Sequence, residues 1–235
     1  MQRPSRLRTR RPLVSRFAAS DRDSLLQGCE RVAMCAGDIL STPGAKVRHV
    51  YFPIEGSIAL SAHELDTSWL GIALVGDEGM LGASLLLGQL PAPYHATVQR
   101  AGDAWRMDAT AFLVELERAP GLRQTLQRYL QALTCQLART AACSRYHLAE
   151  ARLARWLLMT RDRAHANQFH LTHDYLAGVL GIRRAGVTRA ASDLRMRHFI
   201  HYKRGDILID DGPGLEAAAC SCYAADWLNY RRILG

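Results

Sequence analysis

The sequence predicts an α+β chain in which an antiparallel β-roll is followed by a long helix and then by a small helical domain that ends in a β-hairpin. Between residues 32 and 107, short apolar segments alternate with turns that contain glycine. From residue 122, apolar residues recur every three or four positions. From residue 171, two short helical patterns separated by a glycine precede two short strand patterns. This succession of periodicities is the basis of the predicted architecture.

Three parts are expected along the chain. Residues 1–19 are rich in arginine and have no apolar periodicity, so we predict a basic flexible tail. Residues 20–146 are predicted to form the roll together with the long helix. Residues 147–235 are predicted to form the second domain, with a helical appendage at its C-terminal end.

The composition favours a globular protein with a polyanionic partner. The 235 residues are 49% hydrophobic and carry a formal charge of +8 at pH 7, which attracts nucleic acid without fixing a fold. Lys46 and Lys203 are the only lysines, so arginine supplies nearly all the positive charge. A guanidinium group can form paired hydrogen bonds with phosphate or guanine. We expect no membrane span, because no run of about 18 apolar residues occurs.

The roll is predicted from short strands separated by turns. The strand patterns cover residues 47–53, 55–60, 69–75 and 94–99, with Gly76-Asp77-Glu78-Gly79 as a turn after the third. This spacing is typical of an antiparallel roll or barrel. Residues 80–87 are apolar and predict a short helix that lines the roll. The residues expected around an effector pocket are Leu85, Tyr94, His95 and Tyr129.

The long helix is predicted from Leu122 to Ser144, after a shorter helix at 108–117 and a break at Pro120-Gly121. Its apolar stripe extends over many turns between the two domains, which favours pairing with a second copy of the chain. The alternative is that the stripe packs against the roll. The predicted dimer contacts are Leu122, Leu126, Tyr129, Leu133 and Leu137.

The segment from residue 171 to residue 198 has the pattern of two helices joined by a sharp corner. Thr172 can cap the first helix, and Gly181 can adopt the positive φ that a corner needs. The spacing of Ala177, Gly181 and Val187 is similar to that of a helix-turn-helix, whose second helix enters the DNA major groove. The second helix is predicted to bury Val187, Ala190 and Leu194 and to expose Arg184, Thr188, Arg189 and Arg195.

A hairpin is predicted directly after this second helix. Its strand patterns are 199–202 and 207–210, joined by the basic turn from Lys203 to Asp206. A hairpin in this place is typical of a wing, and its tip can contact phosphate. An ordinary helical hairpin with solvated arginines is the alternative, but the number of arginines favours DNA binding. The predicted DNA contacts are Thr172, Arg183, Arg184, Thr188, Arg189, Lys203 and Arg204.

A roll, a long dimerisation helix and a winged helix-turn-helix, in this order, resemble the catabolite-activator and fumarate-nitrate-reduction (Crp/Fnr) regulator family. The resemblance covers about residues 20–212. It is carried by Val50-Tyr51-Phe52-Pro53, Gly56 and residues 76–82 in the roll, and most specifically by residues 171–209. It implies a jelly roll like that of cyclic-nucleotide-binding domains and a cytoplasmic, homodimeric transcription factor. The implied partners are double-stranded DNA with half-sites about 34 Å apart, RNA polymerase and an effector of unknown identity.

The sequence departs from the cyclic-nucleotide-binding members of this family. In those members a glutamate after a glycine holds the ribose, and an Arg-Ser or Arg-Thr pair holds the phosphate. Here Ala83 follows Gly82, and Tyr94-His95 stand in the place of the pair. The missing arginine removes a charge-assisted contact of about 1.5–3 kcal/mol. We therefore expect another effector, or none, instead of conventional binding of cAMP or cGMP.

No metal or cofactor is expected from the sequence. An iron–sulfur cluster needs four converging thiolates, and the closely spaced N-terminal cysteines of the redox-sensing family members are missing. Cys220 and Cys222 alone do not complete a zinc site. The histidines near the roll, His49, His63 and His95, are scattered. Six cysteines are also too few for a disulfide scaffold, so buried structural thiols in a reducing cytoplasm are expected.

The second helix of the motif also departs from the family pattern of a capping serine, Arg-Glu and arginine. Here Arg183, Arg184-Ala185 and Arg189 take these places. Arg184 and Arg189 can each bind guanine O6 and N7, whereas Ala185 offers a methyl group for thymine. We therefore expect a different half-site. Because Arg183 cannot cap the helix, a DNA phosphate is expected to accept from its first amides.

The sequence also bears on two other function classes. An enzyme is not expected, because the sequence contains no Gly-x-Ser-x-Gly elbow and no His-Glu-x-x-His helix, and residues 76–79 are not a phosphate loop. A protein-interaction module that has lost DNA binding is the other alternative. The exposed arginines argue against it, and a salt-dependent affinity for DNA would exclude it.

Overall fold

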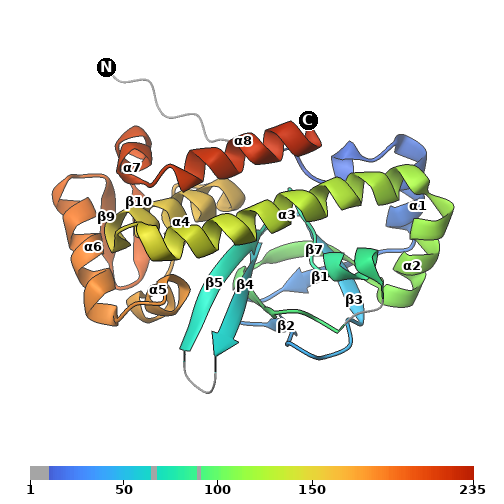
Figure 1. Cartoon of the computed structure of the whole chain (residues 1–235), viewed down its shortest axis with the longest axis horizontal. Helices are drawn as coiled ribbons and strands as arrows, with labels where there is room; N and C mark the ends of the chain where they lie inside the picture. Colours follow the sequence, from blue (N-terminus) through green and yellow to red (C-terminus); the bar gives the residue numbers. More distant parts are fainter. Residues whose placement is uncertain (1–10, 65–67, 89–90) are drawn as a thin grey trace.

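The structure is a computed structural model of the whole chain, and it describes residues 11–64, 68–88 and 91–235. A 27-residue helix, α3 (Pro120–Tyr146), crosses the molecule. The β-roll lies on one side of α3, the C-terminal helix α8 (Cys222–Leu234) lies on the other, and the winged domain forms one end (Figure 1). This is the predicted order of roll, long helix and winged helix-turn-helix.

The roll consists of two antiparallel sheets. One has the strand order β1 (Glu30–Met34), β7 (Gly102–Asp108), β3 (His49–Pro53), and the other has the order β2 (Ile39–Ser41), β6 (His95–Arg100), β4 (Ser57–Glu64), β5 (Ser68–Val75). The four predicted strands correspond to β3, β4, β5 and β6. The other three, β1, β2 and β7, were not predicted; β1 and β2 are short edge strands with only one buried side chain between them. The core between the sheets includes Val50, Phe52, Ile58, Leu60, Val98 and Met107.

The predicted flexible tail is wrong for its last part. Leu13 is fully buried and donates its backbone N–H to Asp77 O at 2.8 Å. Phe17 packs edge-on against Phe52, with ring centroids 6.3 Å apart. Two apolar side chains four residues apart thus anchor a basic segment, through η1 (Val14–Arg16), to the core ahead of α1 (Ala19–Gln27). Residues 1–10 lie outside the described residues.

The apolar stripe of α3 packs on the roll of its own chain. Helix α2 (Ala109–Arg118), capped by Asp108, leads into it. Four of the five predicted dimer contacts are buried in the core of the roll, namely Leu122, Leu126, Tyr129 and Leu133, and Leu137 is half-buried against it. The assignment of the four buried side chains to a dimer interface is therefore wrong, because the roll presents apolar surface along the helix, whereas the contact predicted for Leu137 stays a prediction. The 3-10 helix η2 (Ala83–Leu87), expected as a short helix at 80–87, also contacts α3.

The winged domain has its own core. It contains α4 (Ala149–Ala164), β8 (Gln168–His170), α5 (His173–Leu180), α6 (Arg184–Met196), β9 (Ile200–Lys203) and β10 (Asp206–Ile209), with the sheet order β8-β10-β9. The strand β8 was not predicted, because only Phe169 of its three residues is buried. The core includes Leu153, Leu157, Phe169, Val187, Leu194 and Ile207.

The C-terminal appendage returns along the long helix. Pro213 and Gly214 lie in the first turn of α7 (Gly212–Ala218), after the wing has ended, and Asp211 Oδ1 accepts from Gly214 N at 3.0 Å. Helix α8 then packs along α3 (Figure 1). At its end, Arg16 Nη1 donates to Leu234 O at 2.7 Å. This hydrogen bond links the first described segment of the chain to the end of α8.

The winged domain is docked on the roll by polar and aromatic contacts. The guanidinium of Arg163 lies 2.5 Å from Glu78 Oε1, and both side chains are buried. Tyr175 OH donates to Gln99 Oε1 at 2.8 Å, and its ring centroid lies 5.5 Å from that of Trp69. The turn at residues 76–79 therefore joins the roll to α4. Within the described residues, no helix is long and apolar enough to span a lipid bilayer.

Candidate functional site

The corner between α5 and α6 has the predicted local chemistry. Thr172 Oγ1 accepts from Tyr175 N at 3.2 Å and so caps α5. Gly181 has φ +59°, and Ile182 N donates to Ala177 O at 3.0 Å across the end of the helix. Such a left-handed residue with a backward hydrogen bond ends a helix sharply. The corner expected at Gly181 is confirmed.

Helix α6 presents a basic face to the outside. Val187, Ala190, Ala191 and Leu194 are buried, and these include the three residues predicted to be buried. The face formed by Arg184, Ala185, Thr188 and Arg189 is exposed. The helix lies at the end of the molecule farthest from the roll (Figure 1). Its N-cap residue, Arg183, makes no side-chain cap hydrogen bond, so the first amides of α6 point outward without that partner.

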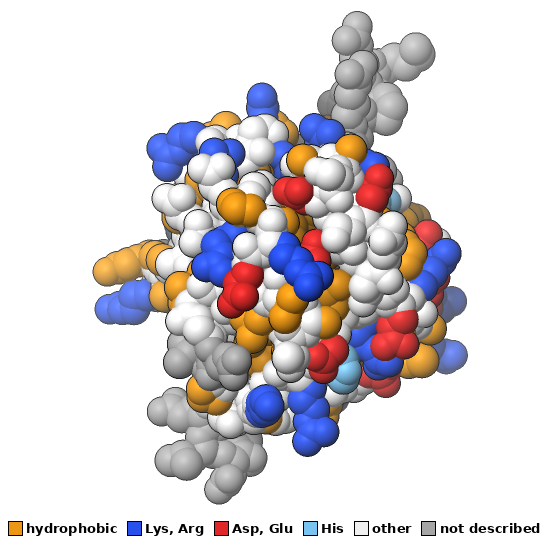
Figure 2. Space-filling view, turned by 90° about the vertical axis from the view of Figure 1, so that its right-hand side faces the viewer, with side chains coloured by type: hydrophobic (Ala, Val, Ile, Leu, Met, Phe, Trp, Pro, Cys, Tyr) orange, Lys and Arg blue, Asp and Glu red, His pale blue; other side chains and the backbone are white. Residues whose placement is uncertain are grey.

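Ion pairs distinguish these arginines from most of the others in this domain. Buried carboxylates hold Arg155, Arg161 and Arg163, which belong to α4. Arg184 Nε lies 3.4 Å from Asp174 Oδ1, but both side chains are about 70% exposed, so the pair is weak. Within the described chain no hydrogen bond or ion pair of the side chain engages Arg183, Arg189, Lys203 or Arg204. At the opposite end of the molecule, basic and acidic side chains are interspersed (Figure 2).

The wing is a tight hairpin with a basic tip. Lys203 pairs with Asp206, and the two residues between them have positive φ, +52° at Arg204 and +94° at Gly205. Positive φ at both central residues is typical of a type I′ turn. A Cβ at Gly205 would lie 2.4 Å from the His170 ring, whose Nδ1 is 2.9 Å from Asp206 Oδ1. The tip is therefore held by β8, with Lys203 and Arg204 exposed.

A histidine that no sequence motif marks, His173, joins α5, α6 and the wing. His173 Nδ1 lies 3.0 Å from Thr188 Oγ1, and the His173 ring stacks on Tyr202 with centroids 4.4 Å apart. Thr188 Oγ1 also donates to Arg184 O at 3.1 Å. Burial lowers the pKa of His173, and the nearby charge of Arg184 lowers it further. Nothing in the spacing of these residues marks the contact, because it depends on the angle between the helices.

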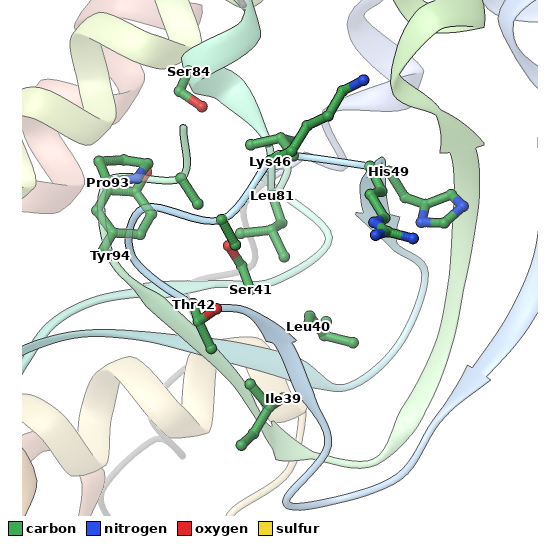
Figure 3. A pocket seen from close by; sticks show the side chains of 15 residues that line it. Ile39, Leu40, Ser41, Thr42, Lys46, His49, Leu81, Ser84, Pro93 and Tyr94 are labelled. Atoms are coloured by element: carbon green, nitrogen blue, oxygen red, sulfur yellow. The ribbon is translucent and has the colours of Figure 1, made fainter. Parts of the chain in front are cut away.

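The roll contains a cavity of about 250 Å³ between β2, the segment that follows it and residues 81–84 and 92–94 (Figure 3). Tyr94 and Pro93 lie at one side of it, and Lys46 and His49 at the other. Its described lining also includes Arg48 and the hydroxyls of Ser41, Thr42 and Ser84, but no carboxylate. The charged side chains that border it, Lys46 and Arg48, are therefore both basic.

The four residues predicted for an effector pocket do not line one cavity, although Leu85, Tyr94 and Tyr129 pack in the same core. Tyr94 lines the 250 Å³ cavity, and Leu85 lines a neighbouring one of about 380 Å³. His95 instead lies against His63, with ring centroids 3.8 Å apart. Tyr129 is buried and donates to Met80 O at 3.0 Å, and burial raises its pKa. Tyr94 precedes β6 and His95 is its first residue, so the two neighbours in sequence lie in different surroundings.

The fold also gathers three cysteines and a histidine that come from two distant parts of the sequence. Ligand atoms of Cys143, His147, Cys220 and Cys222 lie within 4.8 Å of one another. A hydrogen bond from Cys220 lowers the pKa of the Cys143 thiol, and the charge of Arg155 also lowers it. The expectation that Cys220 and Cys222 stand alone is wrong, because α8 brings them to the end of α3. Cys35 is exposed, and Cys29 and Cys135 are half-buried elsewhere.

Comparison with known proteins is in agreement with this architecture. The profile of the cyclic nucleotide-binding domain matches residues 31–119, and that of the Crp-like helix-turn-helix domain matches residues 151–218. Together they cover more than half of the chain. No curated protein matches the sequence significantly.

Solved structures share the fold at low sequence identity. A transcriptional regulator of the Crp/Fnr family from Eubacterium rectale is 15% identical with a TM-score of 0.69, and the match covers 88% of this chain and 97% of that one. FixK2 from Bradyrhizobium japonicum is 14% identical with a TM-score of 0.70, covering 82% and 98%. CLP from Xanthomonas campestris, described as a c-di-GMP responsive global regulator, is 17% identical with a TM-score of 0.67, covering 82% and 99%.

Proposed function

The chain belongs to the Crp/Fnr family of transcription regulators, and from this premise we propose that it is a cytoplasmic homodimer that binds a specific sequence of double-stranded DNA. The family and the fold are those of regulators and not of enzymes. The observation that carries the proposal is the exposed basic face of α6, which has Arg184 and Arg189 on the outside and its apolar residues in the core.

The proposed contacts with DNA involve those side chains whose hydrogen-bonding groups are not already used within the protein. Arg184 and Arg189 each present a fork of donors to guanine in the major groove. Because the Thr188 hydroxyl is bonded within the protein, Thr188 contributes its methyl group instead of a hydrogen bond. Likewise, the hydroxyl oxygen of Thr172 already accepts the hydrogen bond that caps α5. We therefore assign Thr172 only a minor contact with the DNA backbone.

Phosphate contacts are proposed for the groups around the recognition helix. Arg183 stands at its N-terminus, where the amides of the first turn also favour an anion. Lys203 and Arg204 form the exposed tip of the wing. These contacts position the protein on DNA and are independent of sequence. The Arg184 and Arg189 contacts, together with Ala185 against a thymine methyl, define the half-site.

Dimerisation is proposed through the face of α3 that neither the roll nor α8 covers. Its exposed residues include Gln127, Gln131, Thr134, Ala138 and Ala141. The small side chains among them allow two helices to approach closely. Two recognition helices in one particle would read two half-sites on the same side of the duplex.

The sensor domain is proposed not to bind cyclic nucleotides in the usual way. Ala83 is buried and has no carboxylate to accept from ribose hydroxyls. The cavity bordered by Lys46 and Arg48 favours a small anionic effector if the regulator has one. Titration with cAMP, cGMP and c-di-GMP, followed by calorimetry, tests this point. Saturable binding of cAMP or cGMP at micromolar concentration would contradict it.

Selection of binding sites from random DNA, followed by fluorescence anisotropy, tests DNA recognition. Arg189→Ala is expected to weaken binding to the selected site by about 1–3 kcal/mol and to relax the preference at one base position. Arg204→Ala should weaken binding to all sequences alike. Arg128→Ala, which removes an exposed arginine of α3, is the matched control for net charge. Equal losses for all three variants on every DNA would contradict base reading by α6.

A further inference from the structure

The cysteine–histidine cluster lies where three segments of the chain meet. Cys143 is in the last turn of α3, and His147 is the residue that ends α3 and precedes α4. Cys220 follows α7, and Cys222 is the first residue of α8. All three sulfur atoms belong to buried residues, and His147 is half-buried. The cluster thus joins the hinge between roll and winged domain to the C-terminal appendage.

The distances in the cluster correspond to the edges of a small tetrahedron. Cys143 Sγ lies 3.5 Å from Cys220 Sγ, and Cys222 Sγ lies 3.6 Å from His147 Nδ1. The four ligand atoms all lie within 4.8 Å of one another. A tetrahedral zinc ion with Zn–S bonds of about 2.3 Å and a Zn–N bond of about 2.0 Å has edges of about 3.5–3.8 Å. Small side-chain adjustments therefore bring all four atoms into the first shell of one ion.

The small size of the donor set and its sulfur and nitrogen atoms favour one soft metal ion over a metal cluster. An iron–sulfur cluster carries several irons with bridging sulfides, and its ligands are spread more widely than these four. Three thiolates and one imidazole form one of the donor sets of structural zinc sites. A disulfide between Cys143 and Cys220 would use two of the four donors and leave His147 and Cys222 beside it without a role.

Two arginines offset the charge of such a site. Three thiolates and one Zn²⁺ carry a net charge of −1, which is unfavourable in a buried place without a cation. Arg155 is buried and interacts with the charges of Cys143 and Cys220, and Arg152 interacts with the same two groups. Arg155 is itself fixed by hydrogen bonds to Thr140 and Asp226. The surroundings are therefore arranged for an anionic metal–thiolate centre.

We propose that Cys143, His147, Cys220 and Cys222 bind one zinc ion in a tetrahedral site that fastens α8 to the end of α3 and to the hinge before α4. Binding displaces one proton from each of the three thiols and involves no change of oxidation state. The site stands apart from the DNA-contacting face, so it does not rest on the function proposed above. Its place at the hinge means that the ion fixes the angle at which the winged domain leaves α3.

Metal analysis of the full-length protein tests the proposal. The protein is expressed with added zinc, purified with a thiol reductant and without chelator, and examined by plasma mass spectrometry. We expect about one zinc ion per chain. Substitution with Co²⁺ is expected to give the visible d–d bands of a tetrahedral centre and the charge-transfer absorption of cobalt–thiolate bonds. Wild-type protein that is folded yet holds neither zinc nor tetrahedral cobalt would overturn the proposal, as would a Cys143–Cys220 disulfide in the reduced preparation.

Variants separate the site from unspecific thiol binding. Cys222→Ser and His147→Ala are expected to lower zinc affinity by at least about tenfold. His147→Cys, which supplies a fourth thiolate, is expected to retain the metal. Cys135→Ser, which alters a cysteine on the same helix outside the cluster, is the matched control and should keep full occupancy. If Cys222→Ser does not fold, the cobalt titration of the wild-type chain and of Cys135→Ser still decides. Loss of metal in Cys135→Ser to the same degree would contradict the assignment.

Discussion

The imidazole of His173 and the hydroxyl of Thr188 meet at 3.0 Å across the corner of the helix-turn-helix. Because the Thr188 hydroxyl donates to Arg184 O, its oxygen accepts from Nδ1–H of the neutral imidazole. His173 Nε2 then carries no proton, and it is buried without a partner in the described chain. Protonation would place a second N–H and a positive charge in this spot, beside Arg184. The neutral ring is therefore the form that the folded corner stabilises.

The first prediction concerns the effect of pH on stability. The pKa of His173 is lowered in the folded chain by burial and by Arg184, while Asp174 acts in the opposite direction. Between the folded pKa and the unfolded value of about 6.5, the unfolded chain binds more protons, so stability rises with pH. The contribution is complete above about pH 6.5 and is lost as the pH falls through the folded pKa. Urea unfolding at a series of pH values between about 5 and 8 measures it.

A comparison of two histidine variants isolates this effect from the other titrating groups. His173→Gln is expected to flatten the decline in unfolding free energy at acidic pH. His201→Gln, which alters an exposed histidine of the wing strand β9, is the control and should leave the profile unchanged. Identical acid profiles for the wild type and His173→Gln would show that the ring is not held in its neutral form.

The second prediction concerns the N-terminus of the recognition helix. Arg183 has the extended backbone of an N-cap residue, with φ −65° and ψ 146°, but makes no side-chain cap hydrogen bond. Serine in this conformation can accept from a first-turn amide. Arg183→Ser is therefore expected to raise the unfolding free energy by about 0.5–2 kcal/mol and to weaken DNA binding by removing a cation. Arg183→Ala should weaken DNA binding similarly without raising stability. Unchanged or lower stability of Arg183→Ser would contradict the capping argument.

The sequence contains enough information for the helix-turn-helix because its signals are local. The cap at Thr172, the corner at Gly181 and the burial of Val187 each depend on neighbours within about one turn of helix. The DNA-facing residues follow from the same periodicity, since they are what remains on the exposed side of α6. The basic turn from Lys203 to Asp206 likewise follows from its place between two strand patterns, whereas the positive φ of Arg204 and Gly205 is seen only in the structure.

The remaining features depend on contacts between distant segments. An apolar stripe predicts that a helix is covered, but not by what, and α3 is covered by the roll of its own chain. Leu13 is buried because it packs on the roll beside Asp77, with which it forms a backbone hydrogen bond. Nothing in the arginine-rich N-terminal sequence indicates this contact. Cys143 and Cys220 are 77 positions apart, and only the return of α8 along α3 brings them together. The periodicity of a sequence identifies which face of a helix is buried, whereas the segment that covers this face depends on the topology of the whole chain.

The third prediction separates the two sides of α3. Leu126 is fully buried against the roll, so Leu126→Ala is expected to lower the unfolding free energy by about 2–5 kcal/mol. Ala138 lies on the exposed side. Ala138→Arg is expected to shift a dimer toward monomer without loss of stability of the single chain. Light scattering after size exclusion measures the mass, and urea unfolding at low concentration measures the stability. A monomeric but otherwise unaltered Leu126→Ala protein would reverse the assignment of the two faces.

The fourth prediction concerns the ion pair between the roll and the winged domain. Arg163 and Glu78 are 2.5 Å apart, with only 2% and 4% of their side chains exposed. Removing one charge of a buried pair leaves the other without compensation, which costs about 3–5 kcal/mol. Glu78→Gln keeps the volume of the side chain and should destabilise the chain by about this amount, because Arg163 remains charged. In the double variant Glu78→Gln/Arg163→Met the loss should be smaller than the sum of the single losses.

Amide hydrogen exchange locates the effect of Glu78→Gln. Because the pair joins the turn at residues 76–79 to α4, faster exchange is expected in both segments, while α6 and the wing keep their protection. The exposed pair of Arg197 and Glu150, with a separation of 2.7 Å, supplies the control. Glu150→Gln should alter stability by less than about 1 kcal/mol, since solvent replaces the lost contact. If Glu78→Gln behaved like Glu150→Gln, the winged domain would be held on the roll by the packing of Trp69 on Tyr175, and the angle of the recognition helix would not depend on the ion pair.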